Sequence, residues 1–287
     1  MKELQKSILQ IPDTNLVTPL SKDIFTSVIV LNKDSNELLK QCIDSFLKFH
    51  SHFKGEIIIG DTGSSNAELR LINQYIKSLN KNNVKLINLN FYNYSQNNND
   101  IVKNFISEES EYLLFLNNDV EFLNNNLDQF YNLINNNRNM QIGTIGSHLV
   151  FLNQMTQHAG IFVQKIKEKY YFGHNLHNTF FHDYSVSEVF GNTGAVLLIK
   201  KDVFEKCGMF NQNYKLFQDV LLNIECLKLG LKNIYCGTAL AYHFESSTRH
   251  KSEYDKIKDN QILQMDLNKI QNYCIINQEY FKKYYRY

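Results

Sequence analysis

The chain has 287 residues, and its 30 Lys and Arg side chains nearly balance its 29 Asp and Glu side chains. This balance leaves no overall field to attract nucleic acid, so nucleic-acid binding is not expected and any anionic ligand needs a local site. A hydrophobic fraction of 43% and an aromatic fraction of 13% are typical of a folded globular protein. The composition therefore excludes a disordered chain.

The cysteines and the apolar runs indicate the cellular compartment of the protein. The five cysteines contain no CxxC spacing, which predicts buried free thiols in a reducing compartment rather than disulfides or zinc. The chain starts without an apolar signal core, and no run of about 18 apolar residues occurs. We therefore expect a cytoplasmic protein. The basic, Tyr-rich tail at 280–287 could contact the inner face of a membrane peripherally, with a solvated helix end as the alternative.

Along the chain, short apolar runs alternate with segments whose apolar residues recur at helical spacing. Strands are predicted at 26–31, 56–60, 84–89, 111–116, 143–151, 161–165, 194–200 and 233–244. Helices are predicted at 37–49, 69–79, 201–208 and 218–230, and within the Asn-rich stretch 124–140. Residues 170–185, rich in His and aromatic side chains, are expected to form an irregular loop. The alternation predicts βαβ units in one α/β domain, with a mainly parallel central sheet flanked by helices.

Polar residues cluster directly after predicted strands, where parallel sheets bind ligands. Three clusters follow the strands that end at 31, 60 and 116, and a fourth opens the helix at 218. Their members are Asn32 and Asp34; Asp61, Thr62, Gly63 and Ser64; Asn117, Asn118 and Asp119; and Gln218 and Asp219. Carboxylates at such an edge can contact a ribose or base, or hold a divalent ion against phosphates. For any single cluster, a turn or a helix cap is the alternative.

Two other enzyme classes share part of this pattern. The DTGS segment at 61–64 also occurs in aspartic proteases, but those enzymes need two such carboxylates facing each other. This chain has one copy, followed by a predicted helix, so the protease class is excluded. A nucleotidyltransferase would normally carry a Gly-rich loop with Lys or Arg after its first strand, and NKDSNE at 32–37 is not such a loop.

Taken in order, these segments resemble family 2 of the inverting glycosyltransferases, especially bacterial enzymes that build O-antigens, capsules and rhamnose-containing glycans. The resemblance runs from about Thr26 to Arg249. It rests on eight blocks in register, namely SVIVLNKDS, EIIIGDTGSSN, FYNYSQNNND, LLFLNNDVEF, TQHAGIFV, GNTGAVLLIKKDVFEKCGMFN, FQDVLLNIECLKLG and AYHFESSTR. It implies a GT-A fold over 26–249, an N-terminal extension at 1–25 and a helical C-terminal extension at 250–287.

The resemblance also implies a role for each matching position. Asp61 is expected to contact the base or ribose, Asp119 and His243 to bind Mn²⁺ or Mg²⁺ at the donor diphosphate, and Asp219 to activate the acceptor hydroxyl as a base. The other positions expected to bind the nucleotide-sugar are Leu31, Asn32, Asp34, Ser64, Asn98, Asn117, Asn118 and Arg249. The implied reaction is metal-assisted single displacement, which moves a hexose from a UDP- or dTDP-sugar to a hydroxyl of a surface glycan or lipid-linked glycan.

Three positions depart from the family pattern. Asn117 stands where the family's metal-binding DxD motif has its first Asp. Gln218 stands where the family often has an acidic residue or Asn, and Leu221 stands where the family's DVDLC block has its second Asp. Two alternatives therefore stay open, a dTDP-rhamnose-specific rhamnosyltransferase and a catalytically silent module that binds a nucleotide or glycan. Candidates for lining the donor or acceptor pocket, with a plain loop or surface role as the alternative, are His158, His174, His177 and His182.

Overall fold

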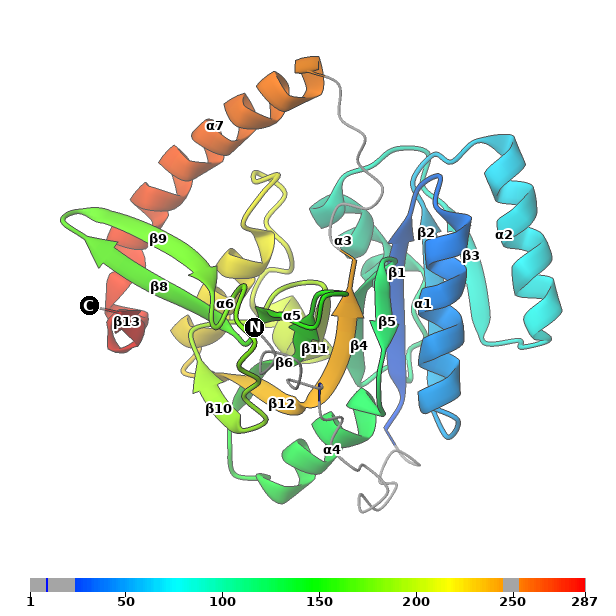
Figure 1. Ribbon diagram of the computed structural model, residues 1–287, viewed down its shortest axis with the longest axis horizontal. Helices are drawn as coiled ribbons and strands as arrows, with labels where there is room; N and C mark the ends of the chain where they lie inside the picture. Colours follow the sequence, from blue (N-terminus) through cyan, green and yellow to red (C-terminus); the bar gives the residue numbers. More distant parts are fainter. Residues whose placement is uncertain (1–8, 10–23, 245–252, 287) are drawn as a thin grey trace, which may run out of the picture.

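Ten strands form one mixed sheet in the computed structural model, which describes residues 9, 24–244 and 253–286. Eight of them follow the order β10-β12-β6-β11-β4-β1-β2-β3, while β5 pairs with β12 and β7 pairs with β6 (Figure 1). Their bounds are β1 Thr26–Asn32, β2 Gly55–Asp61, β3 Val84–Asn88, β4 Tyr112–Asn117, β5 Val120–Phe122, β6 Ile142–Val150, β7 Thr156–His158, β10 Val186–Val189, β11 Val196–Lys200 and β12 Lys232–His243.

The first half of the sheet is parallel and the second half is mixed. Strands β3, β2, β1 and β4 run parallel, as the alternation of strands and helices predicts. Beyond β4, strand β11 runs antiparallel to both β4 and β6, whereas β12 runs parallel to β6. The parallel half therefore brings the carboxyl ends of β1, β2 and β4 to one edge of the sheet.

Helices cover both faces of this sheet, which is why its strands are apolar on both sides. Val28 and Val30 of β1 belong to a core cluster with α1, α2 and α4, whereas Ile29 belongs to a cluster with α3, α5 and α6. The helices are α1 Asn36–Phe49, α2 Asn66–Leu79, α3 Tyr94–Asn104, α4 Asn126–Asn136, α5 Lys201–Lys206, α6 Gln218–Lys228 and α7 Glu253–Asn277. All five cysteines are buried as free thiols. The predicted α/β class, with a central sheet flanked by helices, is confirmed.

A second, three-stranded sheet corrects the prediction for residues 170–185. Strand β8 (Ile161–Ile166) pairs antiparallel with β9 (Lys169–His174), so the first part of the predicted loop is a strand. The two faces of β9 differ in environment, because Tyr170 is buried whereas Tyr171 is 47% exposed. Such alternation is the mark of a strand with one buried face, but the mixed His and aromatic content obscures it in the sequence.

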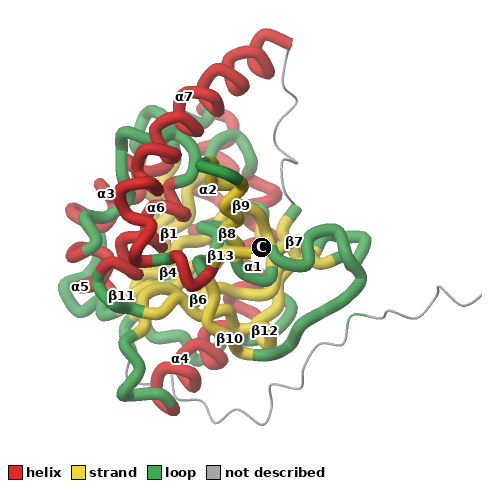
Figure 2. Tube along the Cα trace, turned by 90° about the vertical axis from the view of Figure 1, so that its left-hand side faces the viewer, coloured by secondary structure: helices red, strands yellow, loops and turns green. Residues whose placement is uncertain are grey.

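The chain beyond α7 folds back onto the domain. Helix α7 runs along the outside of the molecule and projects beyond the rest of it (Figure 2). After it, Phe281 is fully buried, and β13 (Tyr285–Arg286) pairs parallel with β8. The tail is therefore not a solvated helix end, because its aromatic residues supply apolar surface that packs on this sheet. In the part of the chain that the structure describes, no helix combines the length and apolar character needed to cross a membrane.

Candidate active site

The carboxyl ends of β1, β2 and β4 lie side by side at one edge of the sheet. Asn32 pairs in register with Asp61, and Leu31 with Asn117, so three of the predicted polar clusters meet there. The side-chain amides of Asn32 and Asn118 are in contact at 2.8 Å. Parallel pairing thus brings together residues that are far apart in the sequence, as expected for a ligand-binding edge.

The loops that follow β1 and β2 are tied together by hydrogen bonds. The backbone N–H of Asp34 donates to Ser64 Oγ at 2.8 Å, and the backbone N–H of Ser65 donates to Asp34 Oδ1 at 2.7 Å. Asp34 has a φ of 47°, a left-handed conformation in which Asp is found more often than most residues. Asp34 and Ser64 therefore fix the position of the loop after β1 relative to the loop after β2.

Asp61, at the end of β2, is 2% exposed and accepts hydrogen bonds from its own loop. Its Oδ2 accepts from the backbone N–H groups of Gly63 at 3.2 Å and Ser64 at 3.0 Å, and the Ser64 hydroxyl donates to Oδ1. Gly63 has a φ of 100°, a conformation that a side chain would strain. Asp61 therefore organises this loop, and its contact with a base or ribose stays a prediction.

Asp119 and His243 meet where β5 pairs with the end of β12. His243 lies opposite Val120 in this antiparallel pair, and the backbone N–H of Phe244 donates to the carbonyl of Asp119 at 2.9 Å. As a result, His243 Nε2 lies 3.3 Å from Asp119 Oδ1 and 3.2 Å from Asn117 Nδ2. The two side chains are only 13% and 12% exposed. The two predicted metal ligands are therefore neighbours in a largely buried position.

This donor set suits a divalent cation that shares its coordination with a diphosphate. Octahedral Mg²⁺ binds oxygen at about 2.1 Å, so two ligand atoms at right angles lie about 3 Å apart. The 3.3 Å between Asp119 Oδ1 and His243 Nε2 fits that spacing. Over residues 24–244 and 253–286, no three His, Cys, Asp or Glu side chains form a group that could hold a metal ion. The remaining ligands would therefore be substrate oxygens or water.

Asp219 lies in the first turn of α6, where backbone donors hold its carboxylate. Its Oδ2 accepts from Gly194 N–H at 3.2 Å, and its Oδ1 accepts from Val220 N–H at 2.8 Å. The segment that contains Gly194 also contacts β4, because Asn117 N–H donates to the Ala195 carbonyl at 3.0 Å. Residues 194–195 therefore link the carboxylate of Asp219 to the carboxyl end of β4.

Tyr94 and Gly194 complete this part of the site. The Tyr94 hydroxyl donates to the Gly194 carbonyl at 3.3 Å. Burial, and next the charge of Asp219, raise the pKa of Tyr94, so its hydroxyl stays protonated. A Cβ on Gly194 would come within 2.6 Å of the Tyr94 hydroxyl oxygen, so any larger residue there would have to displace the Tyr94 side chain. Sequence reasoning missed both residues, although each lies inside a block of the family resemblance.

A cavity of ≈ 620 Å³ opens beside His243. It is lined by Leu149, Gln157, Phe162, Gly173, His174, His177, Thr193 and His243. The ring of His158 is fully buried and packs against His174. Burial, and next the neighbouring His174, lower the pKa of His158 well below its usual value, so its ring is neutral. His182 stacks on Tyr184 instead. Two of the four predicted pocket histidines thus line this cavity.

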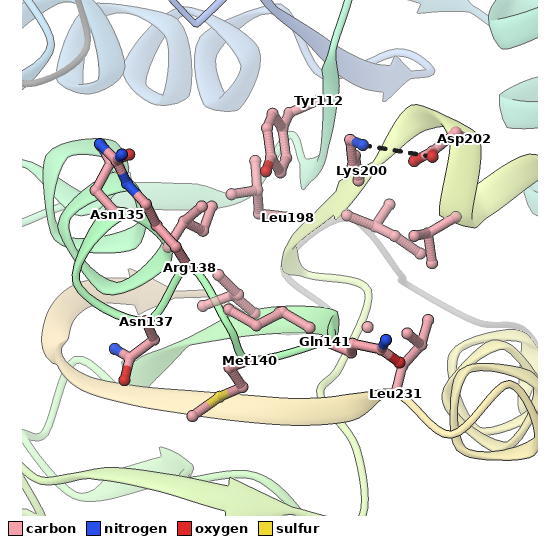
Figure 3. Close-up of a pocket in the computed structure, with 16 residues that line it drawn as sticks. Tyr112, Asn135, Asn137, Arg138, Met140, Gln141, Leu198, Lys200, Asp202 and Leu231 are labelled. Atoms are coloured by element: carbon pink, nitrogen blue, oxygen red, sulfur yellow. Dashed lines mark hydrogen bonds and ion pairs between the residues drawn. The ribbon is translucent and has the colours of Figure 1, made fainter.

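A second cavity, of ≈ 500 Å³, lies at the opposite edge of the sheet (Figure 3). Its walls include Tyr112 at the start of β4 and Lys200 at the end of β11, which pair in register. Lys200 Nζ lies 3.4 Å from Asp202 Oδ2 there. None of the predicted site residues lines this cavity. The edge that carries Asp119 and His243 is therefore the candidate active site.

Of the remaining predicted site residues, Asn98 contacts its own helix and Arg249 is not described, and one further contact was missed. Asn98 is buried in α3 and donates to the carbonyl of Tyr94 in its own helix at 2.9 Å. Arg249 lies outside the described residues. Gln157 of β7, by contrast, contacts the His243 ring, with Oε1 2.7 Å from Nδ1. The TQHAGIFV block contains Gln157, but a linear block cannot reveal a contact between separate strands.

Sequence comparison adds a family and two relatives. The sequence model of glycosyl transferase family 2 matches residues 27–208. The O-antigen biosynthesis protein RfbC of Myxococcus xanthus is 27% identical over 237 residues, which cover 78% of this chain and 17% of that protein. The protein y4gI of Sinorhizobium fredii is 24% identical over 238 residues, which cover 80% of this chain and 26% of that protein. The chain thus spans 17% and 26% of the lengths of these two curated relatives.

Comparison with solved structures shows the same fold at low sequence identity. The crystal structure of GalNAc-T7 with UDP, GalNAc and Mn²⁺ superposes with a TM-score of 0.62 at 13% identity, covering 77% of this chain and 44% of that one. The structure of Staphylococcus aureus TarS 1-349 gives a TM-score of 0.53 at 16% identity, covering 78% of this chain and 61% of that one. Each likeness covers more than three quarters of this chain.

Proposed function

The chain belongs to glycosyl transferase family 2 and has the GT-A fold, and on this basis we propose that it transfers a hexose from a UDP- or dTDP-sugar to a hydroxyl group of a bacterial surface glycan. The observation that carries the proposal is the 3.3 Å approach of Asp119 Oδ1 and His243 Nε2 at the carboxyl edge of the parallel strands. The anionic oxygen is a suitable ligand for Mn²⁺ or Mg²⁺, and the imidazole nitrogen beside it favours Mn²⁺ of the two, because imidazole binds transition metals better than Mg²⁺.

In this proposal Asp119 and His243 lie at the diphosphate of the donor, which belongs to the leaving group. A divalent cation bound there would neutralise the charge that develops on the leaving diphosphate. The loops joined by Asp34 and Ser64 would receive the nucleoside, next to Asn32 and Asp61. Because these residues follow adjacent strands, nucleoside and diphosphate would lie along one continuous edge.

Asp219 is the proposed base for the acceptor. A hydroxyl is a weak nucleophile, and a carboxylate that takes its proton during attack lowers the barrier. The backbone donors on Asp219 fix its position and leave lone pairs on both oxygens. With one base and one leaving group on opposite sides of the anomeric carbon, the reaction is a single displacement with inversion, and no covalent sugar–enzyme intermediate forms.

Two narrower alternatives remain. A rhamnosyltransferase would use dTDP-rhamnose in the same chemistry, and the similarity to an O-antigen biosynthesis protein is compatible with it. A catalytically silent module would bind a nucleotide or glycan without transferring sugar, and the amide at Asn117 favours it. The contact of Asp119 with His243 supports the enzyme, as does the link from Asp219 through residues 194–195 to the end of β4.

The test is a panel of UDP- and dTDP-sugars incubated with the protein, Mn²⁺ and candidate glycan acceptors, scored for release of nucleoside diphosphate. We expect metal-dependent release from one donor, and a fall in kcat of about 10²- to 10⁴-fold in Asp219→Asn. The substitution keeps the shape of the side chain, so thermal stabilisation by UDP should persist. Stabilisation without release from any donor would support the silent module. A protein that shows neither stabilisation nor release would refute the proposal.

A further inference from the structure

Gln157 makes two contacts with one residue, His243. It lies in β7, is 2% exposed, and reaches the last residue of β12. Its Oε1 is 2.7 Å from His243 Nδ1, and its Nε2 is 3.4 Å from the backbone carbonyl oxygen of His243. A single amide therefore contacts both the ring and the main chain of a proposed metal ligand.

This double contact determines which ring nitrogen carries hydrogen. A carbonyl oxygen can only accept, so the NH₂ group of Gln157 must face it, and Oε1 must face the ring. Since Oε1 can also only accept, His243 Nδ1 must donate. In a neutral imidazole the other nitrogen, Nε2, then carries the lone pair. The Asn117 amide is consistent with this assignment, because its Nδ2 lies 3.2 Å from Nε2 and can donate to it.

We propose that Gln157 is a positioning residue that holds His243 in the Nδ1–H tautomer, so that Nε2 offers its lone pair beside Asp119 to a divalent cation. The cation is the one in the proposed function, and to that extent this inference rests on it. With the opposite tautomer, an N–H would point at Asp119 Oδ1, and the two groups would hydrogen-bond to each other instead of sharing an ion. Residues that orient metal-binding histidines commonly change metal affinity 10- to 100-fold when replaced.

The position of Gln157 is itself fixed by its surroundings. Strand β7 pairs antiparallel with β6, where His158 lies opposite Leu149. The carbonyl of Gln157 accepts from His177 Nδ1 at 2.9 Å. The backbone that carries the amide is therefore anchored on both sides, and the side chain of Gln157 has little freedom to turn away from His243.

The direct test is the tautomer of His243 in metal-free protein labelled with ¹⁵N-histidine. Nitrogen chemical shifts at alkaline pH, where a histidine side chain is neutral, distinguish Nδ1–H from Nε2–H. The His243 signals are assigned by their loss in His243→Asn. We expect Nδ1–H in the wild type, a mixture or Nε2–H in Gln157→Leu, and Nδ1–H again in Gln157→Glu, which keeps an acceptor facing the ring. Gln141→Leu, at the opposite edge of the sheet, is the matched control.

Metal affinity is the second readout, measured by calorimetry with Mn²⁺ and UDP. We expect the apparent Kd for Mn²⁺ to rise about tenfold or more in Gln157→Leu and to be unchanged in Gln141→Leu. A wild-type Nε2–H signal, or an unchanged Nδ1–H signal in Gln157→Leu, overturns the inference. A shifted tautomer with unchanged Mn²⁺ affinity overturns its link to the cation. Expected tautomers in a protein that transfers no sugar would count against the proposed function alone.

Discussion

At the scale of single residues, position 117 decides how the candidate metal site is charged. An amide stands there in place of a carboxylate, and its Nδ2 lies 3.2 Å from His243 Nε2. Asn117 therefore contributes no negative charge, and its NH₂ group competes with a cation for the lone pair on Nε2. The nearby Asp119 is left as the anionic side chain next to His243.

Replacing Asn117 by Asp should tighten cation binding. The added charge lies near the cation in a partly buried site, where a unit charge at about 4 Å contributes several kcal/mol before desolvation is subtracted. We expect the apparent Kd for Mn²⁺, measured by calorimetry with UDP present, to fall about tenfold or more. Asn139→Asp adds the same charge on the exposed segment before β6 and serves as the control. Equal affinities in the two variants would show that side chain 117 does not contact the ion.

At the scale of elements, His50 joins the end of α1 to the start of α4. Its Nδ1 donates to the Phe46 carbonyl at 2.7 Å, and its Nε2 accepts from the Leu127 backbone N–H at 3.2 Å. The two contacts can form together only with a neutral ring, since a protonated ring would have no acceptor for the Leu127 N–H. Burial lowers the pKa of His50 from 6.5 to about 4, although the Phe46 carbonyl opposes this shift.

The fold should therefore lose stability in acid through His50. The unfolded chain binds a proton near pH 6.5, but the folded chain binds it only near pH 4, so the stabilisation is complete above pH 6.5 and declines as pH falls toward 4. The difference between the folded and unfolded pKa values of His50 corresponds to about 3 kcal/mol of unfolding free energy. In urea titrations, His50→Gln should lose less unfolding free energy over this range than the wild type. Exposed His52→Gln is the control, and parallel curves for wild type and His50→Gln would contradict the argument.

At the scale of the whole molecule, the segment after α7 packs against the helix that carries Asp219. Phe281 belongs to one buried cluster with Val220, Leu221 and Ile224 of α6 and with Phe190. Tyr284 Oη also donates to Glu188 Oε1 of β10 at 2.5 Å. The C-terminal segment is therefore part of the support of the candidate site, although it pairs with β8 in a sheet separate from the one that contains β2, β4 and β5.

Phe281→Ala should destabilise the whole fold. Removing a fully buried phenyl ring leaves a cavity and costs about 3–5 kcal/mol. Urea unfolding followed by circular dichroism should show that loss in one transition. Tyr280→Ala, whose side chain is 48% exposed, should change the free energy of unfolding by less than about 1 kcal/mol. A similar effect of the two substitutions would mean that the tail does not pack as described.

The sequence by itself determined the α/β class and the family, because both depend on local patterns. Apolar runs such as 26–31 and helical spacing as in 37–49 reflect the neighbours of each residue along the chain, and the order of the sequence blocks can be read without knowing any contacts. It also placed Asn32, Asp61 and Asn117 at strand ends, so parallel pairing was enough to predict that they meet. Its weakest prediction was the loop at 170–185, where sparse alternation hid β9.

Only the tertiary structure decided which atoms face each other. The contact of Gln157 with His243 joins β7 to β12, and the contact of Gly194 with Asp219 joins the turn before β11 to α6. No periodicity encodes such pairs, since they depend on how separate strands and helices are packed. The packing of Phe281 is likewise a long-range event, because its partners lie dozens of residues away. Local composition specified the elements, and close packing among distant elements specified the site.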